Sequence, residues 1–169
     1  MKKSFTLLEL LISITLFMII IIFLYKTLDQ TKYSNNLFSK KENILKEFNH
    51  LHNIFLEDIA ESIDKIEVSF DKEKNAIVKI KTNNTYHNSN FNNVTYLVGA
   101  NKKLLRVESQ TSFNEQEISN DMFQKNFFID VLLENIEYFE LANNGNNYNF
   151  IIKEKNKDRL IFNCYSIKE

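Results

Sequence analysis

One carboxylate, Glu9, stands within a long apolar run near the N-terminus. The run extends from Phe5 to Tyr25, which is about the length that a helix needs to cross a lipid bilayer. A charged group among lipid-facing residues is costly, so its presence indicates a function and a cationic partner. Cleavage between Ser4 and Phe5 would create that partner, because the new α-amino group would lie one helical turn from Glu9. The amine can belong to the same chain or to a neighbouring copy that is staggered in a filament.

The residues that flank the apolar run indicate how it lies in a membrane. Lys2 and Lys3 precede the run, so the positive-inside rule places the N-terminus in the cytoplasm. A cleaved secretory signal would need small residues after the run, whereas Tyr25-Lys26-Thr27-Leu28 follows here. An ordinary signal anchor is the more serious alternative, but such an anchor has no use for Glu9.

The segment Lys2-Lys3-Ser4-Phe5-Thr6-Leu7-Leu8-Glu9 resembles the prepilin peptidase site of type IV pilins and type II secretion pseudopilins. The shared features are a short basic leader, a small residue, Phe, Thr-Leu-Leu-Glu and an apolar helix. The resemblance implies that a leader of residues 1–4 is removed, that the new N-terminal Phe5 is N-methylated, and that Glu9 aids subunit docking. The family nearly always has Gly before the cut, so Ser4 is a departure, although Ser is also small.

The same resemblance implies where the protein works and with what. It implies a single-pass protein of the bacterial inner membrane with a periplasmic C-terminal domain, assembled into a periplasmic filament. The implied partners are other pseudopilins or pilins, the prepilin peptidase and the inner-membrane assembly platform.

The apolar pattern beyond the membrane run predicts that the helix continues. Neither Gly nor Pro occurs in the first 98 residues, and apolar side chains recur at helical spacing at Leu37, Ile44, Phe48, Leu51, Phe55, Ile59, Ile63 and Ile66. We predict a transmembrane and filament-core helix over residues 5–28 and its amphipathic continuation over residues 29–64. The stripe is expected to pack on a globular domain, with a free-standing coiled coil as the alternative.

After Asp64 the apolar residues recur at every second position, which predicts an antiparallel β domain over residues 65–169. This domain is expected to be periplasmic. The candidate strands are residues 66–70, 76–81, 94–98, 104–107, 136–141, 148–153 and 160–165. Residues 127–135 fit either a short helix or a strand. Turn signals lie at residues 71–75, 143–147 and 155–158, which favours an antiparallel meander. The predicted class is α+β and pilin-like, with a long N-terminal helix packed on an antiparallel β-sheet.

Four shorter segments are similar in order and spacing to J-type minor pseudopilins of type II secretion and to related minor type IV pilins. They are Phe55-Leu56-Glu57-Asp58-Ile59, Tyr96-Leu97-Val98, Leu104-Leu105-Arg106 and the strand at 136–141. The resemblance implies a minor pseudopilin, a structural and assembly subunit of a pseudopilus for type II protein secretion or DNA uptake. The alternatives are a minor subunit of a type IV pilus and a membrane-anchored periplasmic binding or sensor module, which leaves Glu9 unexplained.

The remaining reactive residue types do not form a catalytic or metal-binding pattern. His50 and His52 are two residues apart and do not share a helical face, and His87 lies in an Asn-rich loop. Cys164 is expected to be a small buried apolar residue. A formal net charge of −1 gives no basic excess, so no direct nucleic-acid binding is expected. We therefore expect no enzyme activity, no catalytic residue, no cofactor and no metal.

Overall fold

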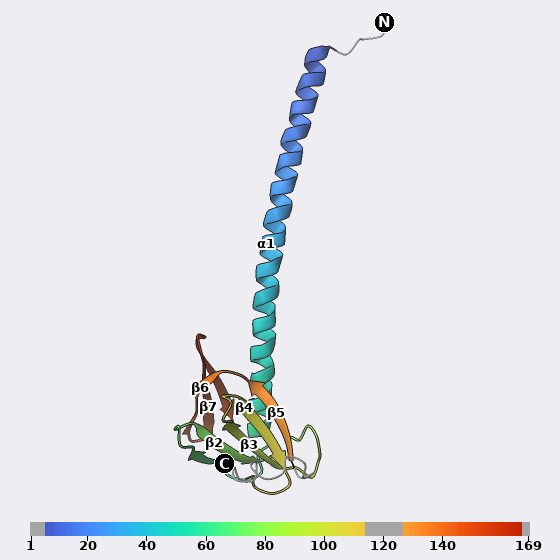
Figure 1. Cartoon of the computed structure of the whole chain (residues 1–169). Coiled ribbons are helices and arrows are strands. Elements are labelled where there is room, and N and C mark those ends of the chain that lie inside the picture. The colour runs from blue at the N-terminus through green and yellow to red at the C-terminus, as the bar shows by residue number, and fades with distance from the viewer. Residues whose placement is uncertain (1–5, 114–126, 167–169) are drawn as a thin grey trace. The chain divides into compact units, whose positions relative to one another are not determined.

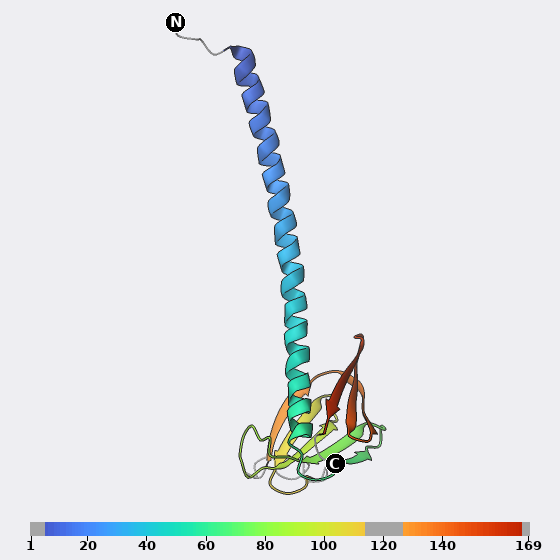
Figure 2. The same cartoon turned by 180° about the vertical axis from the view of Figure 1, so that it is seen from behind.

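The computed structural model describes residues 6–113 and 127–166 of the chain. A single long helix, α1 (Leu7–Ala60), is followed by strands β1 to β8 (Figures 1 and 2). The chain divides into two compact units, Met1–Phe48, which holds the first part of α1, and Asn49–Glu169, which holds its end and the strands. The predicted α+β class with a long N-terminal helix and antiparallel strands is confirmed.

The end of α1 lies at Ala60, four residues before the predicted boundary at residue 64, although no glycine or proline is near. Pairing with another segment ends the helix. Ser62 forms an isolated antiparallel bridge with Thr82, and the Ile63 N–H donates to the Lys81 carbonyl over 2.6 Å. These backbone groups are therefore used in sheet-like pairing and not in another helical turn.

The first sheet has five antiparallel strands in sequence order. They are β1 (Glu67–Phe70), β2 (Ala76–Lys81), β3 (Asn93–Val98), β4 (Leu104–Ser109) and β5 (Phe127–Leu133). The segment that the sequence left open between helix and strand is thus strand β5. Its pairing with β4 shifts register between Leu104 and Leu105, which leaves Leu132 as an extra residue on β5.

The last three strands form a separate sheet, whereas the sequence predicted a single one. They are β6 (Ile136–Asn144), β7 (Asn147–Glu154) and β8 (Arg159–Tyr165), in that order and all antiparallel. The chain turns between β5 and β6 at Asn135, whose φ is 57°. Two turns of the first sheet then accept hydrogen bonds from backbone N–H groups of β6. The Lys102 carbonyl accepts a hydrogen bond from the Ile136 N–H (2.9 Å), and Asn75 Oδ1 accepts one from the Phe139 N–H (3.2 Å).

The predicted turns at residues 71–75 and 143–147 are confirmed as hairpin connections. In the first, Asp71 Oδ1 accepts the N–H groups of Glu73 and Asn75 at 2.7 and 2.8 Å. In the second, Asn144 pairs with Asn147, so the two central residues are Gly145 and Asn146. Gly145 has φ 63°, and a glycine at the first central position is typical of a type II′ turn.

The main core of the second unit forms where the last turns of α1 meet both sheets. Phe55 is fully buried, and its ring lies 4.3 Å from that of Phe150 and 5.2 Å from that of Tyr96. Of the predicted apolar stripe, the residues that are buried on α1 are Leu51, Phe55 and Ile59, joined by Ile54. Leu37 and Ile44 are 44% and 65% exposed, so the prediction that they pack in this core is wrong.

Candidate functional site

Glu9 is fixed at the first turn of α1 by the residue that precedes the helix. Its Oε2 accepts hydrogen bonds from the Thr6 N–H (3.0 Å) and the Thr6 hydroxyl (3.1 Å). In return the Glu9 N–H donates to Thr6 Oγ1 over 3.3 Å. This is a capping box, in which Thr6 is the N-cap and Glu9 the third helical residue. A carboxylate here also lies at the positive end of the helix dipole. The other two predicted site residues, Ser4 and Phe5, lie outside the described residues.

The helix that carries Glu9 is long and apolar enough to cross a membrane. Its most apolar 18-residue window has a mean hydropathy of 2.9, and none of that window is buried in the protein. Glu9 is the one acidic or basic residue between Thr6 and Tyr25. The hydroxyl of Ser13 is not a free polar group, because it donates to the Glu9 carbonyl over 2.8 Å. The carboxylate of Glu9 is therefore the strongest polar feature of this segment.

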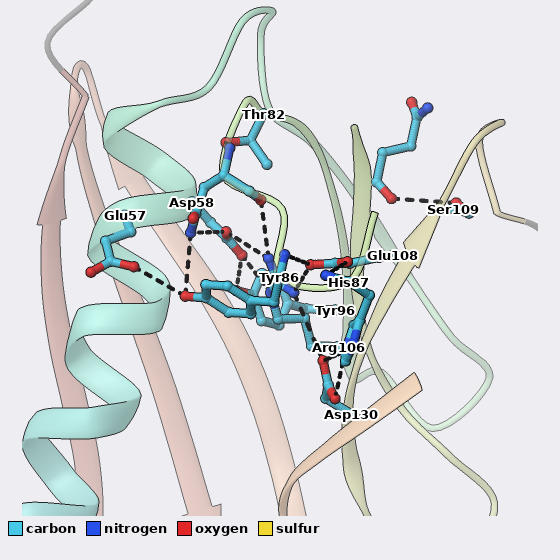
Figure 3. A network of polar contacts seen from close by, with 12 residues as sticks. Glu57, Asp58, Thr82, Tyr86, His87, Tyr96, Arg106, Glu108, Ser109 and Asp130 are labelled. Atoms are coloured by element: carbon cyan, nitrogen blue, oxygen red, sulfur yellow. Dashed lines mark hydrogen bonds and ion pairs between the residues drawn. The ribbon is translucent and has the colours of Figure 1, made fainter. Parts of the chain in front are cut away.

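A second polar cluster, which the sequence analysis did not predict, lies inside the other unit (Figure 3). It joins Asp58 near the end of α1, Tyr96 on β3, and Arg106 and Glu108 on β4, all with no exposed surface. Arg106 holds Asp58 with both arms of its guanidinium, Nε to Oδ2 at 2.8 Å and Nη2 to Oδ1 at 2.9 Å. The Tyr96 hydroxyl donates to Asp58, and Arg106 Nη1 donates to Glu108. We call these four residues the buried network.

The ionisation of the buried network follows from its burial and its pairing. Burial raises the pKa of Asp58, and the hydrogen bonds from Arg106, Tyr96 and Asn84 oppose that rise. Burial by itself lowers the pKa of Arg106, but the hydrogen bond and the attraction of Asp58 outweigh it and raise the pKa. The guanidinium therefore keeps its proton. Burial and the negative charge of Asp58 likewise raise the pKa of Tyr96, so its hydroxyl stays a donor.

The loop between β2 and β3 covers the buried network and reaches β5 (Figure 3). Glu108 accepts the backbone N–H groups of Tyr86 (2.7 Å) and His87 (3.1 Å). Arg106 lies 4.2 Å from the centre of the Tyr86 ring. His87 Nε2 lies 2.9 Å from Asp130 on β5, and its ring stacks on Phe128 at 4.7 Å. The loop is thus attached to the sheet at Tyr86 and His87, by the backbone hydrogen bonds to Glu108 and by the side chain of His87 on Asp130.

The buried network joins the end of α1 to strands β3 and β4, and its polar groups pair with one another. No buried side-chain nitrogen or oxygen lacks a hydrogen-bond partner in the described residues. Within the same residues, no group of three or more His, Cys, Asp or Glu could hold a metal ion. The sequence did contain a signal for the network. Asp58 lies between the stripe residues Phe55 and Ile59, and Arg106 is in step with Leu104 on an apolar strand.

The cysteine and the two histidines of α1 lie outside the buried network. Cys164 is 2% exposed on β8, so its predicted burial is confirmed, and burial raises the pKa of its thiol to about 12. His52 Nε2 lies 3.2 Å from the Asn163 carbonyl, and its ring stacks near Phe162. His50 is exposed on α1.

The N-terminal segment matches a known family model. Residues 1–25 match the model described as Prokaryotic N-terminal methylation motif. The comparison with curated proteins and the comparison with solved structures gave no match. The matched residues include the apolar segment with Glu9, so the chain is similar to type IV pilins and pseudopilins in this motif and in its order of helix and antiparallel strands.

Proposed function

We propose that this chain is a minor pseudopilin, a structural and assembly subunit of an inner-membrane pseudopilus for type II protein secretion or DNA uptake. The observation that carries the proposal is a lone carboxylate held at the head of an apolar helix, inside the residues that match the methylation motif. A simple anchor gains nothing from that carboxylate, because a charge in hydrocarbon is costly. A subunit that must dock its N-terminus on a neighbour does gain from it.

In this proposal each N-terminal residue has one role. Prepilin peptidase cuts between Ser4 and Phe5, the Phe5 amine is methylated, and Glu9 receives that amine during docking. Thr6 becomes the second residue of the mature chain, so it keeps the N–H and the hydroxyl that hold Glu9 Oε2. Cleavage therefore preserves the capping box, and the second carboxylate oxygen of Glu9 is left for the amine of a neighbouring subunit.

Mass analysis of the N-terminus tests the processing step. In cells with active prepilin peptidase, the membrane-bound chain should begin at Phe5 with one added methyl group. In cells without the peptidase it should retain Met1 and the two positive side chains of the leader, Lys2 and Lys3. An intact Met1 in membranes that process other prepilins would contradict the proposal.

Two substitutions at Ser4 locate the cut. Ser4→Leu should accumulate as the longer membrane-bound precursor, because a bulky residue does not fit the place where the family has Gly. Ser4→Gly is the matched control and should be processed at least as fast as the wild type. Normal maturation of Ser4→Leu would mean that the cut lies elsewhere in the chain.

A further inference from the structure

Three of the four sheet edges in the described residues are either short or contacted by another part of the chain. β1 is only four residues long. The edge of β6 is held by the Lys102 carbonyl and the Asn75 side chain. On β8, the Asn163 carbonyl lies 3.2 Å from His52 of α1. Short edge strands and covered edges are common ways to prevent unwanted strand pairing.

The fourth edge, strand β5, has none of these protections in the described part of the chain. It is seven residues long, contains no Lys, Arg or Pro, and pairs with β4 on one side only. Its apolar side chains are exposed on both faces of the sheet, with Phe128 at 44%, Ile129 at 39% and Val131 at 51%. A long apolar edge strand is a template for the addition of an extended segment.

The charges around β5 indicate the chemistry of such a segment. The buried network and the residues that contact it or its loop carry four carboxylates, on Glu57, Asp58, Glu108 and Asp130, against one guanidinium, on Arg106, and the imidazole of His87. Asp130 is the carboxylate on β5 itself. Its side chain is 34% exposed, His87 Nε2 lies 2.9 Å from its Oδ2, and Arg106 Nη1 is 3.9 Å away. A cation from outside would reach Asp130 and offset the excess of negative charge.

We propose that the free edge of β5 receives an extended strand from another pilin-like subunit of the same filament, and that this strand carries a Lys or Arg which reaches Asp130. Main-chain hydrogen bonds to β5 bind the strand, and its apolar side chains pack beside Ile129 and Val131. The cation selects the partner and sets the register. This inference rests on the proposed function, because it takes the partner from the same filament.

Cross-linking in cells tests which segment lies on β5. A photoreactive residue replaces Val131 in the full chain, and the adduct is mapped by mass spectrometry. The expected adduct joins position 131 to an extended segment of a different protein that carries its own N-terminal methylation motif, with a Lys or Arg near the joined residue. An adduct within the chain, an adduct to a second copy, or no adduct would overturn the proposal.

A pair of matched substitutions measures the contribution of the edge. Val131 on β5 and Ile161 on β8 are both β-branched, lie on edge strands, and are 51% and 47% exposed. Val131→Lys should lower the amount of the partner, once identified by cross-linking, that co-purifies with the chain roughly tenfold, as expected for a central contact residue, while Ile161→Lys should leave it unchanged. Both variants should keep the circular dichroism of the wild type. Equal recovery from both variants, or equal loss from both, would overturn the strand-addition proposal.

Processing separates this inference from the proposed function. A chain that begins at Phe5, associates with pilin-like partners through Glu9 and is indifferent to Val131→Lys would refute strand addition alone. A chain that retains Met1 in the presence of active peptidase would refute both.

Discussion

Arg106 on β4 holds Asp58 on α1 with two hydrogen bonds, of 2.8 and 2.9 Å, and neither side chain has any exposed surface. The pair joins the last turns of the helix to strand β4 of the five-stranded sheet. A buried ion pair is weak evidence for net stability, because both charges lose their hydration. Removal of only one partner is nevertheless costly, because the other charge then remains buried without a counter-charge.

Arg106→Met should destabilise the second unit by about 3–5 kcal/mol, because Asp58 and Glu108 would remain buried without their cation. Unfolding of the purified full chain in urea, followed by tyrosine fluorescence, measures the change. Arg159→Met is the matched control. Arg159 is exposed and lies 5.7 Å from the centre of the Tyr138 ring, so its loss should cost about 0.5–1 kcal/mol. Similar losses from the two substitutions would show that the buried network contributes nothing specific.

The division between the two units predicts how truncated chains behave. A fragment that begins at Asn49 contains the second unit and should be soluble and monomeric. A fragment that begins at residue 29 keeps Tyr33, Leu37, Phe38, Ile44 and Leu45, which are all exposed on α1, and it should self-associate. Light scattering at increasing concentration distinguishes the two fragments. If both remain monomeric, the exposed apolar side chains of the first unit do not drive helix association.

Cys164 should make the second unit less stable at alkaline pH. Burial raises the pKa of its thiol from 9.0 to about 12. Between these values the unfolded chain releases the thiol proton and the folded chain keeps it. The contribution of this group is therefore complete below pH 9 and is lost as the pH rises towards 12. Urea midpoints measured across this range should fall less steeply for Cys164→Val, which removes the titrating group and keeps a small apolar side chain.

The native thiol should also react slowly. At pH 8 Cys164 should resist alkylation in the folded chain and react quickly after unfolding in urea, because the thiolate is the reactive form. Rapid alkylation under native conditions would contradict the burial of the thiol at 2% exposure.

The strands were predictable because the alternation of apolar and polar residues is visible in the sequence. The turns at Asp71 and Gly145 were predictable as well. The division into two sheets was not predictable. A period of two shows which side chains share a face of a strand, but it does not show which other strand that strand pairs with. The helical stripe had a similar limit. Its period placed Leu37 and Leu51 on one face, but it did not show that only Leu51 would be covered.

The candidate site shows the same contrast. Glu9 was identifiable because a charge in an apolar run is conspicuous at the level of sequence. Arg106 lies between Leu105 and Val107, but Asp58 follows Glu57, and the two residues are 48 positions apart, so each alone fits a solvated position. Their relationship depends on the packing of α1 on β4, which no local pattern encodes.

At Glu9 the capping box allows the effect of charge to be separated from that of helix geometry. Glu9→Leu removes both the carboxylate and the hydrogen bonds to Thr6, whereas Glu9→Gln keeps an oxygen that can accept them, since Gln also serves at this position of a capping box. Both variants make the helix no less apolar, so both should insert in the membrane and be cut after Ser4. If docking depends on an ion pair with the Phe5 amine of a neighbour, both variants should fail to cross-link to partner pilins, and secretion or DNA uptake should fall. Glu9→Asp keeps the charge with a shorter reach and should give an intermediate defect. Full assembly of Glu9→Gln together with failure of Glu9→Leu would assign Glu9 to the helix cap, and normal assembly of Glu9→Leu would remove its docking role altogether.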